Sequence, residues 1–333
     1  QTCALPICLV HDGIGALQEH AEVFVDEKIR RIQLKPAPKV TIGVGIKSEL
    51  LEMDIHNDLM QPDEIINVLS AYKKKKKYFR LKNGDIIRLE DSGLQLLSEL
   101  TDGLQLKNSQ ISQGKISVPK FRVNYIDDVI RRLTGDADVH RDLRFRKMVR
   151  DMRENSDSEF DNTDSVQAKL RKYQKEGFRW IATLAAYGLG GILADDMGLG
   201  KTLQMLTFLA LTKKRTLIVC PASLVYNWES EVHKFTPGLK AVAVTGTAAV
   251  RQSLLDENTD ADIMITSYDL LKRDVESYSA LKFDCMVIDE AQYIKNAGTQ
   301  AAKAVKQIPA GVRFALTGTP IENRLSDLWS IFD

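Results

Sequence analysis

The chain has 333 residues, of which 44% are hydrophobic and 27% are charged, and this balance excludes a disordered or fibrous protein. At roughly 150 residues per domain, the length predicts two domains, each large enough to bury a core. The formal net charge is +1, so any attraction to nucleic acid must come from local patches rather than from the whole molecule.

The four cysteines form no CxxC pair and have no histidines at metal-ligand spacing, which predicts neither a zinc site nor a disulfide framework. No apolar run approaches the roughly 18 to 20 residues of a membrane span. We therefore expect a soluble cytoplasmic protein with no membrane partner. Residues 1–10 begin with a stretch typical of a translated sequencing adapter, and we expect them to be adapter-derived or disordered.

Residues 11–151 are predicted to form a small α+β domain. Residues 39–46 alternate like a strand, and Asn83-Gly84 is a strong hairpin signal because both residues tolerate positive φ. Apolar residues recur at helical spacing over residues 126–133.

Two cationic clusters lie in this first domain, the lysines at 73–77 and the arginine-rich residues 141–150. Each could contact DNA phosphates, because every neutralised phosphate releases counterions and favours binding. A solvated helix surface is the other interpretation, and the charge pattern alone favours it.

Residues 152–166 are acidic, polar and nearly devoid of apolar residues, and are predicted to form the linker between the domains. In residues 167–333, short apolar runs alternate with helical patterns, which predicts an α/β lobe with a parallel sheet covered by helices on both faces. The expected strands are 191–194, 216–220, 241–245, 263–266, 285–288 and 314–317.

A phosphate-binding loop is predicted between the first of these strands and the helical pattern after it. Gly200-Lys201-Thr202 offers backbone N–H groups that can approach a ligand closely, a lysine for the β- and γ-phosphates and a hydroxyl for Mg²⁺. The helix N-terminus adds a dipole that favours anions. Asp195 stands where the general pattern has glycine.

A second strand end carries two carboxylates. Four apolar residues, 285–288, precede Asp289 and Glu290 and place both acids at the carboxyl edge of the sheet, where open α/β sheets bind ligands. Asp289 is expected to hold Mg²⁺, and Glu290 to polarise the water that attacks the γ-phosphate. Taken without the loop, the two acids are equally typical of a solvated strand end.

These two segments and four others resemble the motifs of the Swi/Snf family of superfamily-two helicase-like ATPases. Motif I is similar to residues 195–202 and motif II to residues 289–292. The adenine-reading segment resembles residues 170–174, the DNA-track motifs Ia and Ib resemble 221–228 and 266–268, and motif III resembles 316–323. The six motifs occur in the family's order, which makes coincidence implausible.

The resemblance implies a role for each matching residue. The nucleotide contacts are implied for Gln174, Asp195, Met197, Gly198, Leu199, Gly200, Lys201 and Thr202. Mg²⁺ ligation is implied for Thr202 and Asp289, and catalysis for Lys201, Asp289, Glu290 and Gln292, where the family often has histidine at the last position. Contacts to double-stranded DNA are implied for Ser223, Asn227, Trp228, Ser267 and Tyr268, and coupling between the two sites for Thr317, Gly318 and Thr319.

The activity implied by this resemblance is that of a DNA-dependent ATPase that uses ATP and Mg²⁺ to translocate along duplex DNA and to act on a DNA-bound protein cargo. The resemblance covers the first of the family's two RecA-like lobes, so hydrolysis is expected to need the second lobe, and this chain alone is expected to be nearly inactive. The first domain resembles the helicase-associated region of bacterial members, which implies a nucleoid-associated bacterial protein. The alternatives are a strand-separating helicase and a nucleotide-binding module without motor activity.

Overall fold

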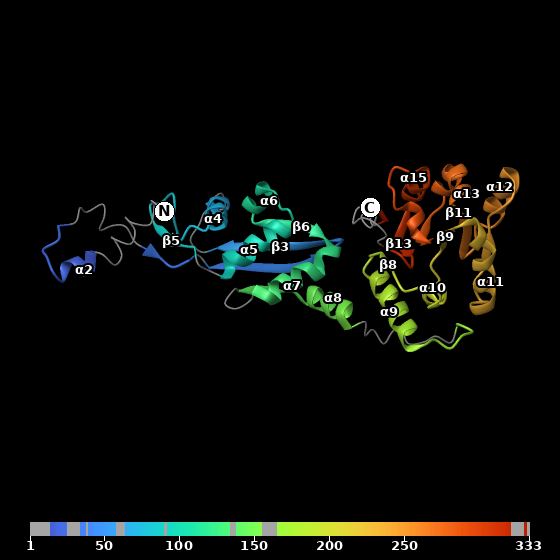
Figure 1. Cartoon of the computed structure of the whole chain (residues 1–333), viewed down its shortest axis with the longest axis horizontal. Helices are drawn as coiled ribbons and strands as arrows, with labels where there is room; N and C mark the ends of the chain where they lie inside the picture. The colour runs from blue at the N-terminus through green and yellow to red at the C-terminus, as the bar shows by residue number, and fades with distance from the viewer. Residues whose placement is uncertain are drawn as a thin grey trace. The chain divides into compact units, whose positions relative to one another are not determined.

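The computed structural model describes residues 14–24, 34–37, 39–57, 64–89, 92–133, 138–154, 165–320 and 330–331. The chain divides into two compact units, residues 1–150 and 151–333, and the division falls within helix α8 (Leu143–Glu154) (Figure 1). The segment 1–10 and residues 155–164 of the expected linker lie outside the described residues. Within the described ranges, no helix combines the length and the apolar composition that a membrane span requires.

The first unit contains a four-stranded sheet with the order β6-β3-β2-β7. Its strands are β2 (Val40–Lys47), β3 (Leu50–Asn57), β6 (Lys115–Pro119) and β7 (Val139–Arg141). Strands β2 and β3 pair antiparallel, and alternate residues of each are buried, as the alternation in residues 39–46 predicts. Edge strand β7 runs parallel to β2 and leads directly into α8.

A smaller sheet in the same unit has the order β1-β5-β4, with strands β1 (Leu34–Lys35), β4 (Tyr78–Arg80) and β5 (Ile86–Arg88). Strands β4 and β5 form the hairpin predicted at Asn83-Gly84, where Gly84 has a φ of 93°. The helices of the unit are α2 (Ile14–Gln18), α4 (Glu64–Lys73), α5 (Ser92–Gly103), α6 (Asn108–Ser112), the 3-10 helix Lys120–Arg122 and α7 (Val123–Leu133).

The second unit is built on a six-stranded parallel sheet with the order β10-β11-β9-β12-β13-β8. All six strands predicted from the sequence are present, namely β8 (Gly191–Leu193), β9 (Thr216–Cys220), β10 (Ala241–Ala243), β11 (Ile263–Ser267), β12 (Phe283–Asp289) and β13 (Ala310–Leu316). The predicted α/β class is therefore confirmed.

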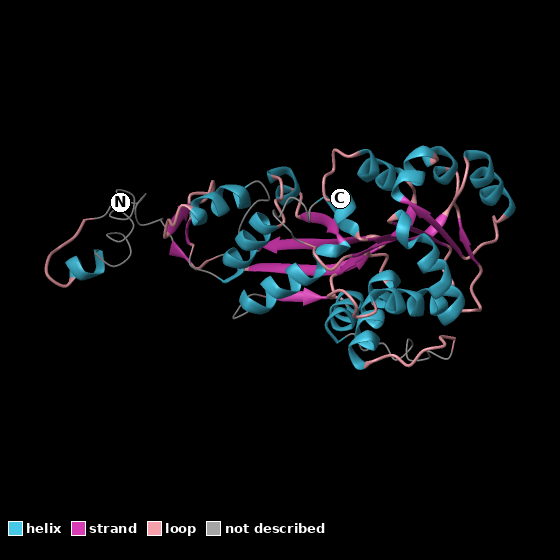
Figure 2. Ribbon diagram, turned by 45° about the vertical axis from the view of Figure 1, so that its right-hand side comes forward, coloured by secondary structure: helices cyan, strands magenta, loops and turns pink. Residues whose placement is uncertain are grey.

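Helices cover both faces of this sheet (Figure 2). They are α9 (Lys172–Ala186), α10 (Lys201–Thr212), α11 (Val225–Phe235), α12 (Ala248–Glu257), α13 (Tyr268–Arg273), α14 (Val275–Ser279) and α15 (Gln300–Gln307), with 3-10 helices at Ala222–Leu224 and Ala291–Ile294.

Alternation along each central strand divides the core between the two faces. In β9, Ile218 and Cys220 pack into the cluster that contains residues of α9, α10 and α11, whereas Leu217 and Val219 pack into the cluster that contains residues of α13 and α15. Because both sets of side chains are buried, such a strand is apolar at every position, and this explains the continuous apolar runs in the sequence.

Candidate nucleotide-binding site

The loop of residues 194–200 joins β8 to α10. Gly198 and Gly200 have φ angles of 81° and 78°, in the left-handed region that residues with a Cβ rarely adopt. A Cβ at Gly200 would also lie 2.6 Å from Nε2 of Gln174, whereas one at Gly198 would meet no heavy atom within 4 Å. The loop therefore presents its backbone at an open surface beside the N-terminus of α10, where phosphate groups bind well.

Lys201 begins α10 and folds its side chain back over this loop. Its Nζ donates to the carbonyl oxygens of Asp195 at 2.8 Å and of Asp196 at 3.1 Å. A phosphate oxygen carries charge and forms a stronger bond to an ammonium group than these neutral carbonyls do. The side chain is therefore placed to contact phosphate.

Asp195, which replaces the glycine of the general pattern, holds the loop to the helix that follows it. Its Oδ2 atom accepts a hydrogen bond from Nε2 of Gln204 at 2.8 Å. Met197 is 69% exposed, and Leu199 and Thr202 are half-buried.

Gln174 has its side-chain amide engaged at both ends. Its Oε1 accepts from the backbone N–H of Arg171 at 2.9 Å, and its Nε2 donates to the carbonyl oxygen of Leu199 at 3.1 Å. Tyr173 donates its hydroxyl to the same carbonyl at 3.1 Å. Gln174 is 7% exposed, and in this arrangement it supports the phosphate loop.

Asp289 lies at the carboxyl end of β12 and is held by two other elements. Oδ2 accepts a hydrogen bond from the indole Nε1 of Trp228 at 2.8 Å, and Oδ1 accepts from the backbone N–H of Glu290 at 2.9 Å. The hydroxyl of Tyr268 donates to the backbone carbonyl of Asp289 at 2.6 Å. Burial raises the pKa of Asp289, and the bond from Trp228 and the positive charge of Lys201 oppose that rise.

Three of the predicted DNA contacts are buried in this structure. The side chains of Trp228, Ser267 and Tyr268 are at most 4% exposed. Ser267 instead caps α13, where its Oγ accepts from the backbone N–H of Leu270 at 3.3 Å. Ser223 and Asn227 are exposed and stay candidates for DNA contact.

A chain of hydrogen bonds links Glu290 to the loop after β13. Gln292 donates through Nε2 to Oε2 of Glu290 at 2.6 Å, and its Oε1 accepts from the hydroxyl of Thr317 at 2.9 Å. The Thr317 hydroxyl also accepts from the backbone N–H of Thr319 at 3.0 Å. Gln292 therefore bridges Glu290 and Thr317 within one chain of hydrogen bonds.

The same loop approaches the phosphate loop. A Cβ at Gly318 would lie 3.1 Å from Cγ of Met197, so the glycine permits close packing between the two segments. Glu290 has a φ of 50°, which is uncommon for a residue with a Cβ. Observed outliers of this kind often lie at functional sites.

The sheet topology explains why these groups meet. Strands β12, β13 and β8 are consecutive neighbours, and parallel strands end at the same edge of a sheet. The carboxylate of Asp289 and the hydroxyl of Thr202 are hard oxygen ligands of the kind that Mg²⁺ prefers. Together with the open backbone at Gly198 and the cation of Lys201, this donor set fits a magnesium-bound triphosphate.

The hydrogen bond from Trp228 to Asp289 could not be found from the sequence. The two residues are 61 positions apart, and a tryptophan in an amphipathic helix is most often a core residue. Tyr268 also holds Asp289, through the backbone carbonyl, and stacks on Tyr293 with ring centroids 5.2 Å apart and planes at 5°.

Two family models match the chain. The model of the SNF2-related domain matches residues 173–333, and the model described as bacterial SNF2 helicase associated matches residues 7–162. The site described above lies within the first of these matches.

Named relatives and one solved structure are similar to parts of the chain. An uncharacterized ATP-dependent helicase of Mycoplasma genitalium is 38% identical over 74% of this chain and 24% of its own length. The TATA-binding protein-associated factor MOT1 of Saccharomyces cerevisiae is 43% identical over 51% of this chain and 10% of its own length. The Sulfolobus solfataricus SWI2/SNF2 ATPase core in complex with dsDNA is 42% identical over 50% of this chain and 36% of that chain, with a TM-score of 0.47. The chain thus spans a quarter or less of the length of these two relatives.

Proposed function

Through residues 173–333 the chain belongs to the SNF2-related domain family, and on that premise we propose that it is part of an ATP-dependent DNA translocase. The observation that carries this proposal is the meeting of the phosphate loop, Lys201, Asp289 and Glu290 at one edge of a parallel sheet. The relatives named as ATP-dependent helicases support the use of ATP.

Each group at the sheet edge has a proposed task. Lys201 and the loop amides bind the phosphates, and Thr202 and Asp289 would hold Mg²⁺, which when bound screens the negative charge of the β- and γ-phosphates. Glu290 orients the attacking water and accepts its proton. Gln292 keeps the Glu290 carboxylate in place through the 2.6 Å hydrogen bond between them.

Duplex DNA is the proposed track, and Ser223 and Asn227 are the proposed contacts within the second unit. Both residues are exposed and lie directly after the carboxyl end of β9. Polar side chains of this kind bind phosphate and sugar oxygens without reading sequence. A DNA-bound protein is the proposed cargo.

Rapid hydrolysis is proposed to need a second lobe. In related phosphoryl transfers the protein mainly positions groups and stabilises charge, and an arginine finger contributes roughly 10³ to 10⁵ in rate. The family resemblance assigns that arginine to the second lobe. We therefore expect this chain to bind Mg²⁺ and ATP and to turn over slowly until that lobe is supplied.

The assignment of the nucleotide site is tested by Lys201→Met, with Lys213→Met as its matched control. Both lysines belong to α10 or its C-terminal cap, so both variants lose one charge from the same helix at opposite ends. A fluorescent ATP analogue should bind Lys201→Met at least about tenfold more weakly, which corresponds to about 1.4 kcal/mol. Its affinity for Lys213→Met should be that of the wild type, and equal losses in both variants would contradict the site.

A strand-separating helicase is the second candidate, because several similar proteins are named as helicases. The parent chain with its second lobe would then unwind a tailed duplex when ATP is present. A translocase would displace a bound third strand or protein and leave that duplex paired.

A further inference from the structure

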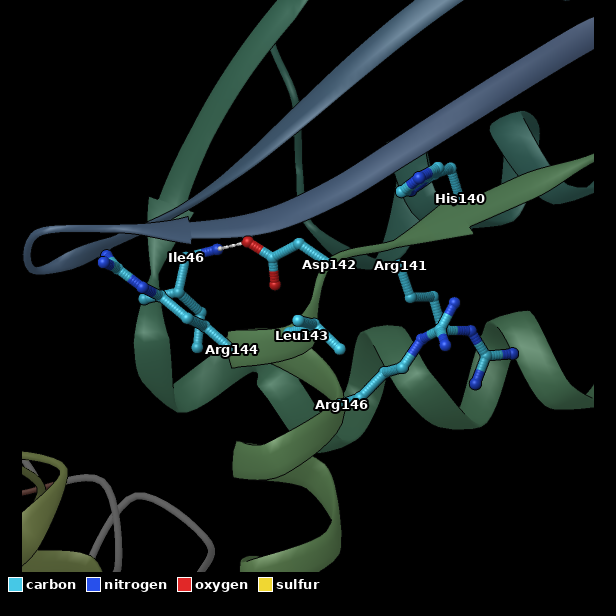
Figure 3. Close-up of a pocket in the computed structure, with 7 residues that line it drawn as sticks. All are labelled: Ile46, His140, Arg141, Asp142, Leu143, Arg144 and Arg146. Atoms are coloured by element: carbon cyan, nitrogen blue, oxygen red, sulfur yellow. Dashed lines mark hydrogen bonds between the residues drawn. The ribbon is translucent and has the colours of Figure 1, made fainter.

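A cationic cavity lies in the first unit, far in sequence from the nucleotide site. It is open, measures about 620 Å³ and is found where β7 leads into α8. Figure 3 shows Arg141 from the strand and Arg146 from the helix reaching toward the same space, with Arg144 on the other side of Asp142. Residues 140–147 hold four Lys or Arg side chains, one histidine and a single acid.

The single acid of this segment is used to build the fold. Asp142 accepts through Oδ2 from the backbone N–H of Ile46 at 3.1 Å, and through Oδ1 from that of Phe145 at 2.6 Å. It therefore ties α8 to the end of β2, as the dashed line in Figure 3 shows for Ile46. Arg141 pairs with the buried Asp127 at 3.1 Å, which fixes that guanidinium at the cavity wall.

Three exposed cations in the first turns of α8 have no such partners. Phe145 and Met148 bury the opposite side of the helix, whereas Arg144, Arg146 and Lys147 are exposed. Within the part of the chain that the structure describes, these three side chains make no hydrogen bond or ion pair.

Other cations of the same unit show what a solvated helix surface looks like here. Arg132 pairs with Glu99 at 2.5 Å and with Asp128 at 3.0 Å, and Lys120 pairs with Glu49 at 2.9 Å. Surfaces of mixed sign are usual, whereas a cluster of one sign repels itself unless an anion approaches it. The charge of α8 is thus concentrated on a chain whose net charge is only +1.

We propose that His140, Arg141, Arg144, Arg146 and Lys147, here called the α8 surface, bind the phosphate backbone of duplex DNA. Guanidinium groups match phosphate oxygens with two parallel hydrogen bonds, and they remain charged at every physiological pH. Arg144 and Lys147 lie one turn apart on the same face of α8 and so can meet neighbouring phosphates. Leu143, 81% exposed between them, can cover the apolar side of a sugar. The choice of DNA as the ligand rests on the proposed function. The α8 surface itself lies in the first unit, outside the unit that holds the nucleotide site.

The test compares two triple variants of the same chain. Arg144, Arg146 and Lys147 are changed to Gln in one, and Lys74, Lys75 and Lys76, three exposed lysines after α4, are changed to Gln in the other. Both lose three positive charges from the same unit, so a general loss of attraction affects them equally. Affinity for a short duplex is measured across a salt series, with thermal unfolding to verify the fold.

The α8 variant should bind the duplex at least about tenfold more weakly at low salt, and the slope of log affinity against log salt should fall by about 2 to 3. The Lys74 to Lys76 variant should keep the wild-type slope. Equal losses in both variants, or an unchanged slope in the α8 variant, would overturn the proposal.

Two controls separate the possible failures. If the wild-type chain binds the duplex and the α8 variant keeps its slope, only the α8 surface is refuted. If the wild type binds no duplex at low salt, the DNA track of the proposed function fails as well. Poly-glutamate of matched charge tests for an acidic protein partner. If the wild-type chain binds poly-glutamate as tightly as DNA and the α8 variant loses this binding, an acidic protein replaces DNA as the ligand.

Discussion

Trp228→Phe removes the indole N–H that holds the carboxylate of Asp289, the proposed Mg²⁺ ligand. Oδ2 of Asp289 then loses the donor that now lies 2.8 Å away, in a site where Trp228 is 1% exposed. A hydrogen bond to a charged group contributes about 1.5 to 3 kcal/mol, and the missing ring atoms add a cavity cost on the order of 1 kcal/mol. We expect the free energy of unfolding to fall by about 2.5 to 4 kcal/mol.

The more specific effect concerns the gain in nucleotide affinity that Mg²⁺ provides. Groups that orient a ligating carboxylate typically change metal affinity by about 10- to 100-fold. We therefore expect the ratio of affinities for a fluorescent ATP analogue, with Mg²⁺ and with EDTA, to fall by about tenfold or more in Trp228→Phe. The affinity measured in EDTA should change little.

Trp180→Phe is the matched control, because it removes the same atoms from a half-buried tryptophan that makes no hydrogen bond within the described residues. In Trp180→Phe, the ratio of the affinities measured with Mg²⁺ and with EDTA should equal that of the wild type. In a chain that already carries Asp289→Ala, Trp228→Phe should have no further effect on the ratio, since the bond has no acceptor. An unchanged ratio in Trp228→Phe, or an equal fall in Trp180→Phe, would refute the positioning role.

Two further predictions concern packing and the cysteines. Gly177→Ala should lower the free energy of unfolding by about 1 to 3 kcal/mol, because the new Cβ would lie 1.8 Å from Oε1 of Gln204 in α10. Urea unfolding measures this change. If the Gly177→Ala variant were as stable as the wild type, that result would contradict the close approach of α9 and α10. Burial raises the pKa of Cys220 and of Cys285 to about 12, so near pH 8 almost none of either side chain is thiolate. Neither should react with iodoacetamide before unfolding, and peptide mass mapping that found rapid modification of either one in the native protein would contradict their burial.

The sheet of the second unit could be predicted because its strands leave a strong local signal. A strand such as β9, buried at all five positions, must be apolar throughout, and the glycines and polar residues around it then mark the loops. The acids at 289 and 290 could be placed for the same reason, since they directly follow such a strand. Local patterns thus predict which residues reach the sheet edge.

Local patterns do not show which way a side chain turns at that edge. Ser223, Asn227 and Trp228 belong to one motif, yet the first two are exposed and the third is buried. Gln174 likewise matches an adenine-reading segment, while its amide is bonded to the backbone at Arg171 and Leu199. The bond from Gln174 to Leu199 joins residues 25 positions apart and the bond from Trp228 to Asp289 joins residues 61 positions apart, and the pattern along one segment cannot contain such contacts.

The neighbouring residues Asn227 and Trp228 lie on two sides of α11, where Asn227 is a proposed DNA contact and Trp228 holds Asp289. Successive residues of a helix point about 100° apart, so one faces solvent while the other reaches the interior. The 2.8 Å bond to Asp289 does not survive a shift of α11 by about 1 Å, because N–H to oxygen bonds weaken steeply beyond about 3.2 Å. DNA that moved α11 would therefore directly alter the hydrogen bond that holds the carboxylate of Asp289. This connection provides a physical route by which the proposed DNA contact could change the nucleotide site, separate from the chain of bonds through Gln292 and Thr317.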